Sequence, residues 1–200
     1  MATITIKPPS TPFATLVPGA RASETYVQLL RFGITPRLSS ARDVEGLLGA
    51  PEKKRLAGQA EIWQYATASD GGFGIGYVHF DLASQRVDAI DFDVPGSYNI
   101  QQIIDDLGPP GLTVLTLPDP ERQSGAPALG GFDMWWPQLL LTVSVYCNGY
   151  REAECRMPSA SERRISLTMS DDAGDKERWT ARVSYANRIR KEILWPGLGP

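Results

Sequence analysis

The residues of this chain that could do chemistry are few. His79 is the only histidine among 200 residues, and it lies in a run that alternates in the manner of a β-strand. A single histidine in such a run is more often a partly buried strand residue than a general base, and no serine and aspartate are spaced to complete a triad with it. The sequence contains no G-x-S-x-G, H-E-x-x-H or C-x-x-C motif. We therefore predict a protein that is not an enzyme.

Carboxylates are the candidate ligands for a cation. They fall into two groups: Asp88, Asp91 and Asp93 with Asp105 and Asp106, and then Asp171, Asp172 and Asp175. Neither group follows the ligand order of an EF-hand loop, so we interpret them as solvated carboxylates at strand edges and turns. The glycines of GGFGIG at 71–76 precede a strand rather than a helix, which is not the arrangement of a dinucleotide loop. The sequence predicts no metal and no cofactor.

Two cysteines, Cys147 and Cys155, flank Asn148-Gly149, a dipeptide that is typical of tight hairpin turns. A two-residue turn would not place the cysteines opposite each other, whereas a longer or bulged loop would bring their Cα atoms within disulfide reach. A disulfide and two small buried thiols both fit this spacing.

Aromatic residues are the stronger candidates for a binding surface. An exposed sheet face that carries Trp and Tyr is typical of protein-binding sites, and the candidates here are Trp63, Tyr65, Trp135 and Trp136. Strand alternation places Trp63 and Tyr65 on one face, which is either a helix-covered core or a contact surface. The adjacent Trp135 and Trp136 must point to opposite faces. We predict that one of this pair contacts a partner.

Composition narrows the classes of partner. The net charge is −3 and the sequence pI is about 5.2, whereas a nucleic-acid-binding domain normally presents a basic face. No run approaches the ~18 apolar residues of a membrane-spanning helix. The 42% of hydrophobic residues is enough for a substantial core. These values favour a protein partner, no nucleic acid and no transmembrane span in this chain.

Two stretches with a common pattern must position these residues. SSARDVEGLLGAP at 39–51 and YNIQQIIDDLGPP at 98–110 both predict a short capped helix that ends at Leu-Gly-x-Pro. Alternating strands are predicted after the first at 61–66, 73–81 and 86–94, and after the second at 132–136, 139–147, 150–156, 163–169 and 178–186. This repetition predicts an α+β fold of two tandem helix-helix-antiparallel-sheet units.

The expected organisation has four parts. Residues 1–22 are a Pro-rich extended arm, 23–94 the first αβ unit and 98–186 the second, which carries a Pro/Gly-rich insert at 109–131. Residues 187–200 are expected to form a C-terminal helical turn and tail.

One family resemblance rests on these residues. The segment GITPRLSSARDVEGLLGAP at 33–51, the Trp63-x-Tyr65 strand and the hairpin between Val78 and Ile90 resemble the BamE/SmpA/OmlA family of small outer-membrane lipoproteins. That fold is shared with the β-lactamase inhibitory protein, which is a tandem of two such units. The resemblance covers about 24–94, and 98–186 more loosely. The chain departs from the family in being twice as long and in lacking a lipobox cysteine near its start.

The resemblance implies a non-enzymatic protein-binding or scaffolding module of the cell envelope, periplasmic or extracellular. Such a module is the ectodomain of a lipoprotein, with a lipid anchor in its precursor, or an accessory subunit of a larger assembly. Two alternatives stay open. One is a small-ligand carrier or enzyme that uses a cleft between the units, with His79, Asp91 and Asp93 as its polar groups. The other is a cytoplasmic subunit of a multiprotein complex.

Overall fold

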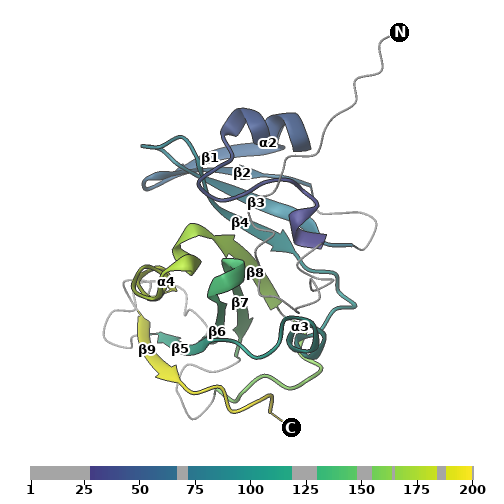
Figure 1. Ribbon diagram of the computed structural model, residues 1–200, viewed down its shortest axis with the longest axis vertical. Coiled ribbons are helices and arrows are strands. Elements are labelled where there is room, and N and C mark those ends of the chain that lie inside the picture. The colour runs from purple at the N-terminus through teal and green to yellow at the C-terminus, as the bar shows by residue number, and fades with distance from the viewer. Residues whose placement is uncertain are drawn as a thin grey trace.

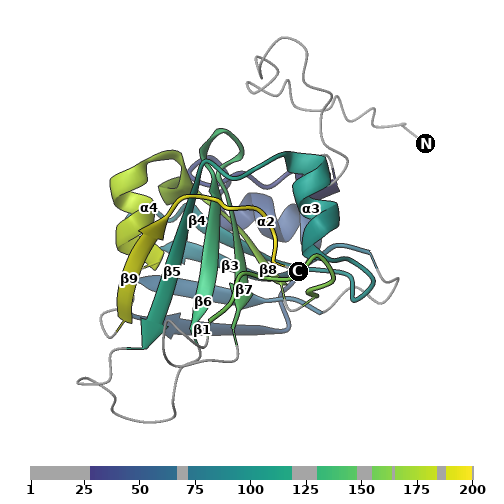
Figure 2. The ribbon, with the colours of Figure 1, turned by 90° about the horizontal axis from the view of Figure 1, so that it is seen from below.

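A single antiparallel sheet organises the chain. The computed structural model describes residues 28–66, 72–118, 130–147, 155–163, 165–183 and 188–199, and their nine strands form one sheet in the order β1-β2-β3-β4-β8-β7-β6-β5-β9. The sheet is strongly twisted, so that β1 to β4 run across the direction of β5 and β6 (Figures 1 and 2). The predicted α+β class is confirmed.

The elements follow each other in two similar series. The first is α2 (Ala41–Leu48), β1 (Lys53–Ala57), β2 (Ala60–Gln64), β3 (Gly74–Asp81) and β4 (Val87–Asp93). The second is α3 (Ile100–Leu107), β5 (Leu112–Pro118), β6 (Gly131–Trp136), the 3₁₀ turn η1 (Pro137–Leu139), β7 (Leu141–Tyr146) and β8 (Ile165–Ser170). The 3₁₀ turn η3 (Asp171–Gly174), α4 (Lys176–Val183) and β9 (Arg188–Ile193) complete the chain.

Both predicted short helices are confirmed, and both are closed by the same local chemistry. Ser40 caps α2, and its side chain and that of Asp43 each bond the other's backbone N–H. Asn99 and Gln102 do the same for α3. The helices end at Gly49 and Gly108, whose φ angles of 81° and 78° suit a residue without a Cβ.

The prediction of two tandem units is wrong, because the strands of the two series join in one sheet. Strand β4, the last of the first series, pairs with β8 from Ala89 with Ser170 to Phe92 with Leu167. This pairing satisfies the backbone groups of two strands that would otherwise be sheet edges. No boundary between units is left at 94–99, and both series contribute to the same hydrophobic core.

That core lies on one face of the sheet. Trp63, Val78 and Phe80 from the first series and Trp136 and Leu167 from the second belong to one buried cluster, which α2 and α3 cover through Val44, Ile100 and Ile103. The Trp63 ring packs against the Phe80 ring in a tilted arrangement, with ring centroids 4.6 Å apart. The Nε1 atom of Trp136 donates to the carbonyl of Gly108 at 3.1 Å, which ties β6 to the end of α3.

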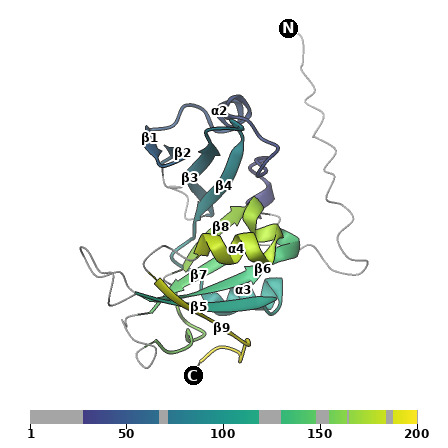
Figure 3. The same ribbon diagram turned by 90° about the vertical axis from the view of Figure 1, so that its left-hand side faces the viewer.

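The other face is covered only over the second series. There α4 and η3 pack against β5, β6 and β7, opposite α3 (Figure 3). Trp179 of α4 is fully buried, stacks on Trp135 at 5.2 Å and donates its Nε1 hydrogen to Thr142 Oγ1 at 2.7 Å.

Two predictions at the C-terminal end are also wrong. The predicted strand 178–186 begins as helix α4, because Asp175 accepts the backbone N–H of Arg178 at 2.9 Å and starts a helix there. In place of the helical turn predicted within 187–200, Arg188–Ile193 form strand β9, which pairs along β5. Within the Pro/Gly-rich segment 109–131, Leu112–Pro118 form strand β5 of the sheet.

Several predictions lie outside the described residues. They are the Pro-rich arm at 1–22, the Asn148-Gly149 turn and most of the strand expected at 150–156. Within the described part of the chain, no helix is long and apolar enough to span a membrane.

Replacement of Trp63 by alanine is expected to lower the free energy of unfolding by about 3–5 kcal/mol, because a buried aromatic ring would leave a cavity. Urea unfolding followed by tryptophan fluorescence measures this loss. Leu56→Ala is the matched control, since Leu56 lies on the neighbouring strand, points to the same side and is 72% exposed. Leu56→Ala should change the free energy of unfolding by less than about 0.5 kcal/mol. Equal losses of stability in the two variants would contradict the conclusion that Trp63 is a core residue.

Candidate functional site

The face of β1 to β4 that points away from α2 carries polar and aromatic side chains, and we call it the open face. The pairing register of the strands arranges the side chains of the open face in two rows. One row runs Lys53, Gln64, Tyr77, Asp91 and Thr168 across five adjacent strands. The second row consists of Arg55, Ile62 and His79. The described helices pack on the opposite side of these strands or over β5 to β7, so the open face has no helical cover in the described structure.

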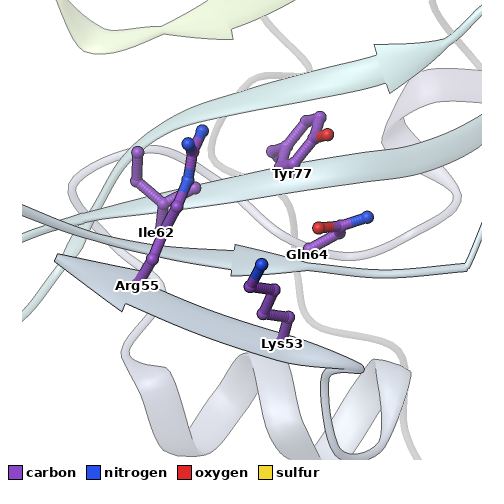
Figure 4. Close-up of a pocket in the computed structure, with 5 residues that line it drawn as sticks. All are labelled: Lys53, Arg55, Ile62, Gln64 and Tyr77. Carbon is purple, nitrogen blue, oxygen red and sulfur yellow. The ribbon is translucent and has the colours of Figure 1, made fainter. Parts of the chain in front are cut away.

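A shallow pocket of about 90 Å³ lies in the open face near the β1 edge (Figure 4). Ile62, which is 7% exposed, forms its apolar floor. Lys53, Arg55, Gln64 and Tyr77 complete the lining, and the Arg55 guanidinium carbon lies 5.9 Å from the centroid of the Tyr77 ring. Within the described residues, none of these four side chains has a hydrogen-bond or ion-pair partner. The pocket therefore combines two cations and two further hydrogen-bonding groups.

A polar network lies beside the pocket. His79 Nε2 is 2.7 Å from Asp91 Oδ2, and Thr168 Oγ1 donates to Asp91 Oδ1 at 2.7 Å. Both carboxylate oxygens of Asp91 are thus engaged. The structure brings together two of the three polar groups considered for a ligand site, His79 and Asp91.

Asp93, the third group, sits in a different environment. Its carboxylate lies over Gly76, where an added Cβ would come within 2.8 Å of Oδ1. Its Oδ2 atom is buried without a hydrogen-bond partner, and burial raises the pKa of Asp93. The close approach explains why β3 carries glycine at position 76.

The four aromatic residues considered as partner contacts, Trp63, Tyr65, Trp135 and Trp136, lie away from the open face. Trp63 and Trp136 are 3% and 0% exposed, so both belong to the core and present no surface to a partner. Trp135 is half-buried, and its Nε1 donates to the carbonyl of Ala173 at 2.6 Å beneath η3. Trp135 and Trp136 do point to opposite faces, as predicted, but α4 and η3 cover the side that carries Trp135.

Tyr65 is also held within the structure. It is half-buried just beyond β2, and its hydroxyl donates to the carbonyl of Gly49 at 3.4 Å. Burial, and secondarily the charge of Glu45, raises the pKa of Tyr65 to about 12. The contact joins β2 to the end of α2, which is a structural role.

Sequence reasoning missed the basic residues of the pocket. Lys53-Lys54-Arg55 lies in the exposed edge strand β1. The signal that could have identified them is the two-residue period of a strand, which places Lys53 and Arg55 on one face and Lys54 on the other. On that other face, the Nζ atom of Lys54 lies 3.8 Å from the centroid of the Trp63 ring.

Asp171, Asp172 and the two cysteines make contacts that hold the scaffold together. Asp171 forms ion pairs with Arg37 and Arg178, and Asp172 pairs with Arg178. No group of three or more potential ligand residues gathers in the described structure to hold a metal ion. Cys147 and Cys155 form a disulfide with Cα atoms 5.3 Å apart, packed with Leu115 and Phe132 in a separate apolar cluster.

No protein-family model and no curated protein matches this sequence. Among solved structures, the chain is similar to a DUF4309 family protein (YjgB) from Bacillus subtilis subsp. subtilis str. 168, with a TM-score of 0.43 and 13% sequence identity. The match covers 73% of this chain and 95% of that chain. A similarity at this level supports no inference about function.

Replacement of Asp93 by asparagine is expected to stabilise the protein at neutral pH. Burial disfavours the charged carboxylate, so the folded pKa lies above the unfolded value of 3.8. Well below pH 3.8, Asp93 is protonated in both the folded and the unfolded state, so the variant and the parent protein have the same free energy of unfolding. The variant becomes the more stable of the two as the pH rises from 3.8 through the folded pKa of Asp93. Urea unfolding of both proteins across this range measures the difference.

Asp81→Asn provides a control of opposite sign. The backbone N–H of Ser84 donates to Asp81 and lowers its pKa, so its charge stabilises the folded state at neutral pH and loses that effect in acid. A pH-independent effect of Asp93→Asn, or a loss of stability at neutral pH, would contradict the interpretation of Asp93.

Proposed function

We propose that this chain is a non-enzymatic protein-binding module that holds a partner on its open face. The observation that carries the proposal is the pocket over Ile62, where Lys53, Arg55, Gln64 and Tyr77 offer hydrogen-bonding groups that the described protein does not use. A partly apolar surface that carries Arg and Tyr is typical of binding hot spots. Residues on strands also hold their positions better than residues on loops.

The polar network beside the pocket gives less support to a catalytic role. In a hydrolytic triad the histidine bonds both an aspartate and a nucleophile. Here His79 bonds Asp91, and within the described residues no hydroxyl or thiol bonds His79. Thr168 instead bonds the same carboxylate. The network fixes the orientation of Asp91 and His79 at the border of the binding surface.

We place the module in the cell envelope, outside the cytoplasm, as the ectodomain of a lipoprotein or as an accessory subunit of a larger assembly. The Cys147–Cys155 disulfide supports this location because disulfides persist mainly in oxidising compartments. The sequence resemblance to the BamE family, given by the segment 33–51 and the strands after it, supports the same location.

A photo-crosslinking phenylalanine analogue placed at Gln64, which lines the pocket, is expected to capture a discrete partner protein in native cells. The same analogue at Leu47 of α2 is the matched control, because Leu47 is 56% exposed on the opposite side of the sheet. Immunoblotting and mass spectrometry identify the products. Equal capture from both positions, or none from Gln64, would refute binding on the open face.

The location predicts the redox state of the cysteines. Alkylation of thiols in intact cells, followed by mass spectrometry of the native protein, should find Cys147 and Cys155 unmodified until a reductant is added. A sample reduced before alkylation is the positive control. Full modification of both cysteines without reductant would place the protein in a reducing compartment and support the cytoplasmic alternative.

A further inference from the structure

The pocket in the open face has the composition of an anion site. We propose that it binds a carboxylate, namely the side chain of a glutamate or aspartate in an acidic segment of the partner protein. The inference rests on the proposed function, that a protein binds the open face, and adds the chemistry by which the partner is recognised.

The donors of the pocket suit a carboxylate in number and kind. The planar guanidinium of Arg55 can donate two parallel hydrogen bonds to the two oxygens of one carboxylate, and the ammonium of Lys53 adds a second positive charge. The amide of Gln64 and the hydroxyl of Tyr77 supply neutral donors. All four line the same pocket (Figure 4).

The neighbouring groups leave this positive charge uncompensated. Asp91, the next residue in the row after Tyr77, lies on the side of the pocket away from Lys53 and has both oxygens bonded by His79 and Thr168. Lys53 and Arg55 form no ion pair in the described structure. An incoming carboxylate therefore meets cations that no carboxylate of the described chain occupies.

The floor and the edge of the pocket favour a protein side chain over a free ion. Ile62 offers an apolar surface for the methylene groups that precede a glutamate or aspartate carboxylate. Strand β1, which pairs only with β2 in the described structure, lies at the end of the sheet. If an extended segment of the partner pairs with β1, every second side chain of that segment points to the open face.

The charge of β1 also selects against a second copy of this chain. All five residues of β1 are exposed, and Lys53, Lys54 and Arg55 would oppose the same cations in an edge-to-edge pair. Negative charges on a partner segment would attract these cations instead of repelling them. Strand β1 is therefore suited to bind a negatively charged segment.

The test uses the full chain and two labelled probe peptides, acetyl-Val-Glu-Val-Glu-Val-amide and its glutamine counterpart, with binding followed by fluorescence anisotropy and by two-dimensional NMR. The glutamate peptide should bind about tenfold more tightly or better, since its bonds to Arg55 and Lys53 are charge-assisted. Its affinity should fall as salt is added. Arg55→Gln and Lys53→Gln should each reduce the difference between the two peptides.

Lys54→Gln is the matched control. It removes the same charge from the same strand, but Lys54 lies over Trp63 on the other face, so the preference for glutamate should persist. Thermal melts establish that all three variants are folded.

Equal binding of both peptides, no binding of either, or an equal effect of Lys54→Gln would overturn the proposal. Inorganic phosphate that displaces the glutamate peptide at lower concentrations than acetate does would identify a general oxyanion site and also overturn it. The two proposals fail separately. A partner that is crosslinked at Gln64, and whose capture is unchanged by Arg55→Gln, would leave the proposed function standing and remove only the carboxylate subsite. No capture from Gln64 would remove the proposed function itself.

Discussion

The pairing of β4 with β8 is the interaction on which the rest of the structure depends. It joins strands 77 positions apart at Asp91 and Thr168, and it turns two four-stranded series into one sheet. Because the sheet is continuous from β4 to β8, α2 and α3 lie over the same face of it and share one core. Without the pairing, Ile90, Phe92 and Leu167 would lie at sheet edges, and the apolar area they bury would return to water.

The same pairing decides where a partner can reach the sheet. With one face closed by α2 and α3, the second face is covered by α4 and η3 over the second series only. Asp171 at the start of η3 pairs with Arg37 in the turn before α2, so the cover is anchored to the first series. Strands β1 to β4 keep their second face free of helices in the described structure, and that face carries the cations, Tyr77 and the network of His79.

The residues of the site were only partly accessible to sequence reasoning. Alternation in β3 and β4 placed His79 and Asp91 among the polar candidates, and the structure brings them within hydrogen-bond distance. Their residue types could not assign the aromatic residues to the core or to a contact surface, because large rings are used in both. Trp63 and Trp136 are core residues. Lys53 and Arg55 gave no sequence signal of a site, because a short basic cluster has the same composition in a solvated loop as on an edge strand.

The sequence by itself determined what depends on near neighbours in the chain. The two short helices, their capping residues Ser40 and Asn99, their glycine ends and the strands β2, β3, β4 and β6 follow from hydrogen bonds and periodicities that span a few residues. Only the tertiary structure decided that β4 meets β8, that 176–183 is a helix packed on Trp135, and that β9 completes the sheet. A period of two shows that a strand has two faces, but which face is covered depends on elements distant in sequence.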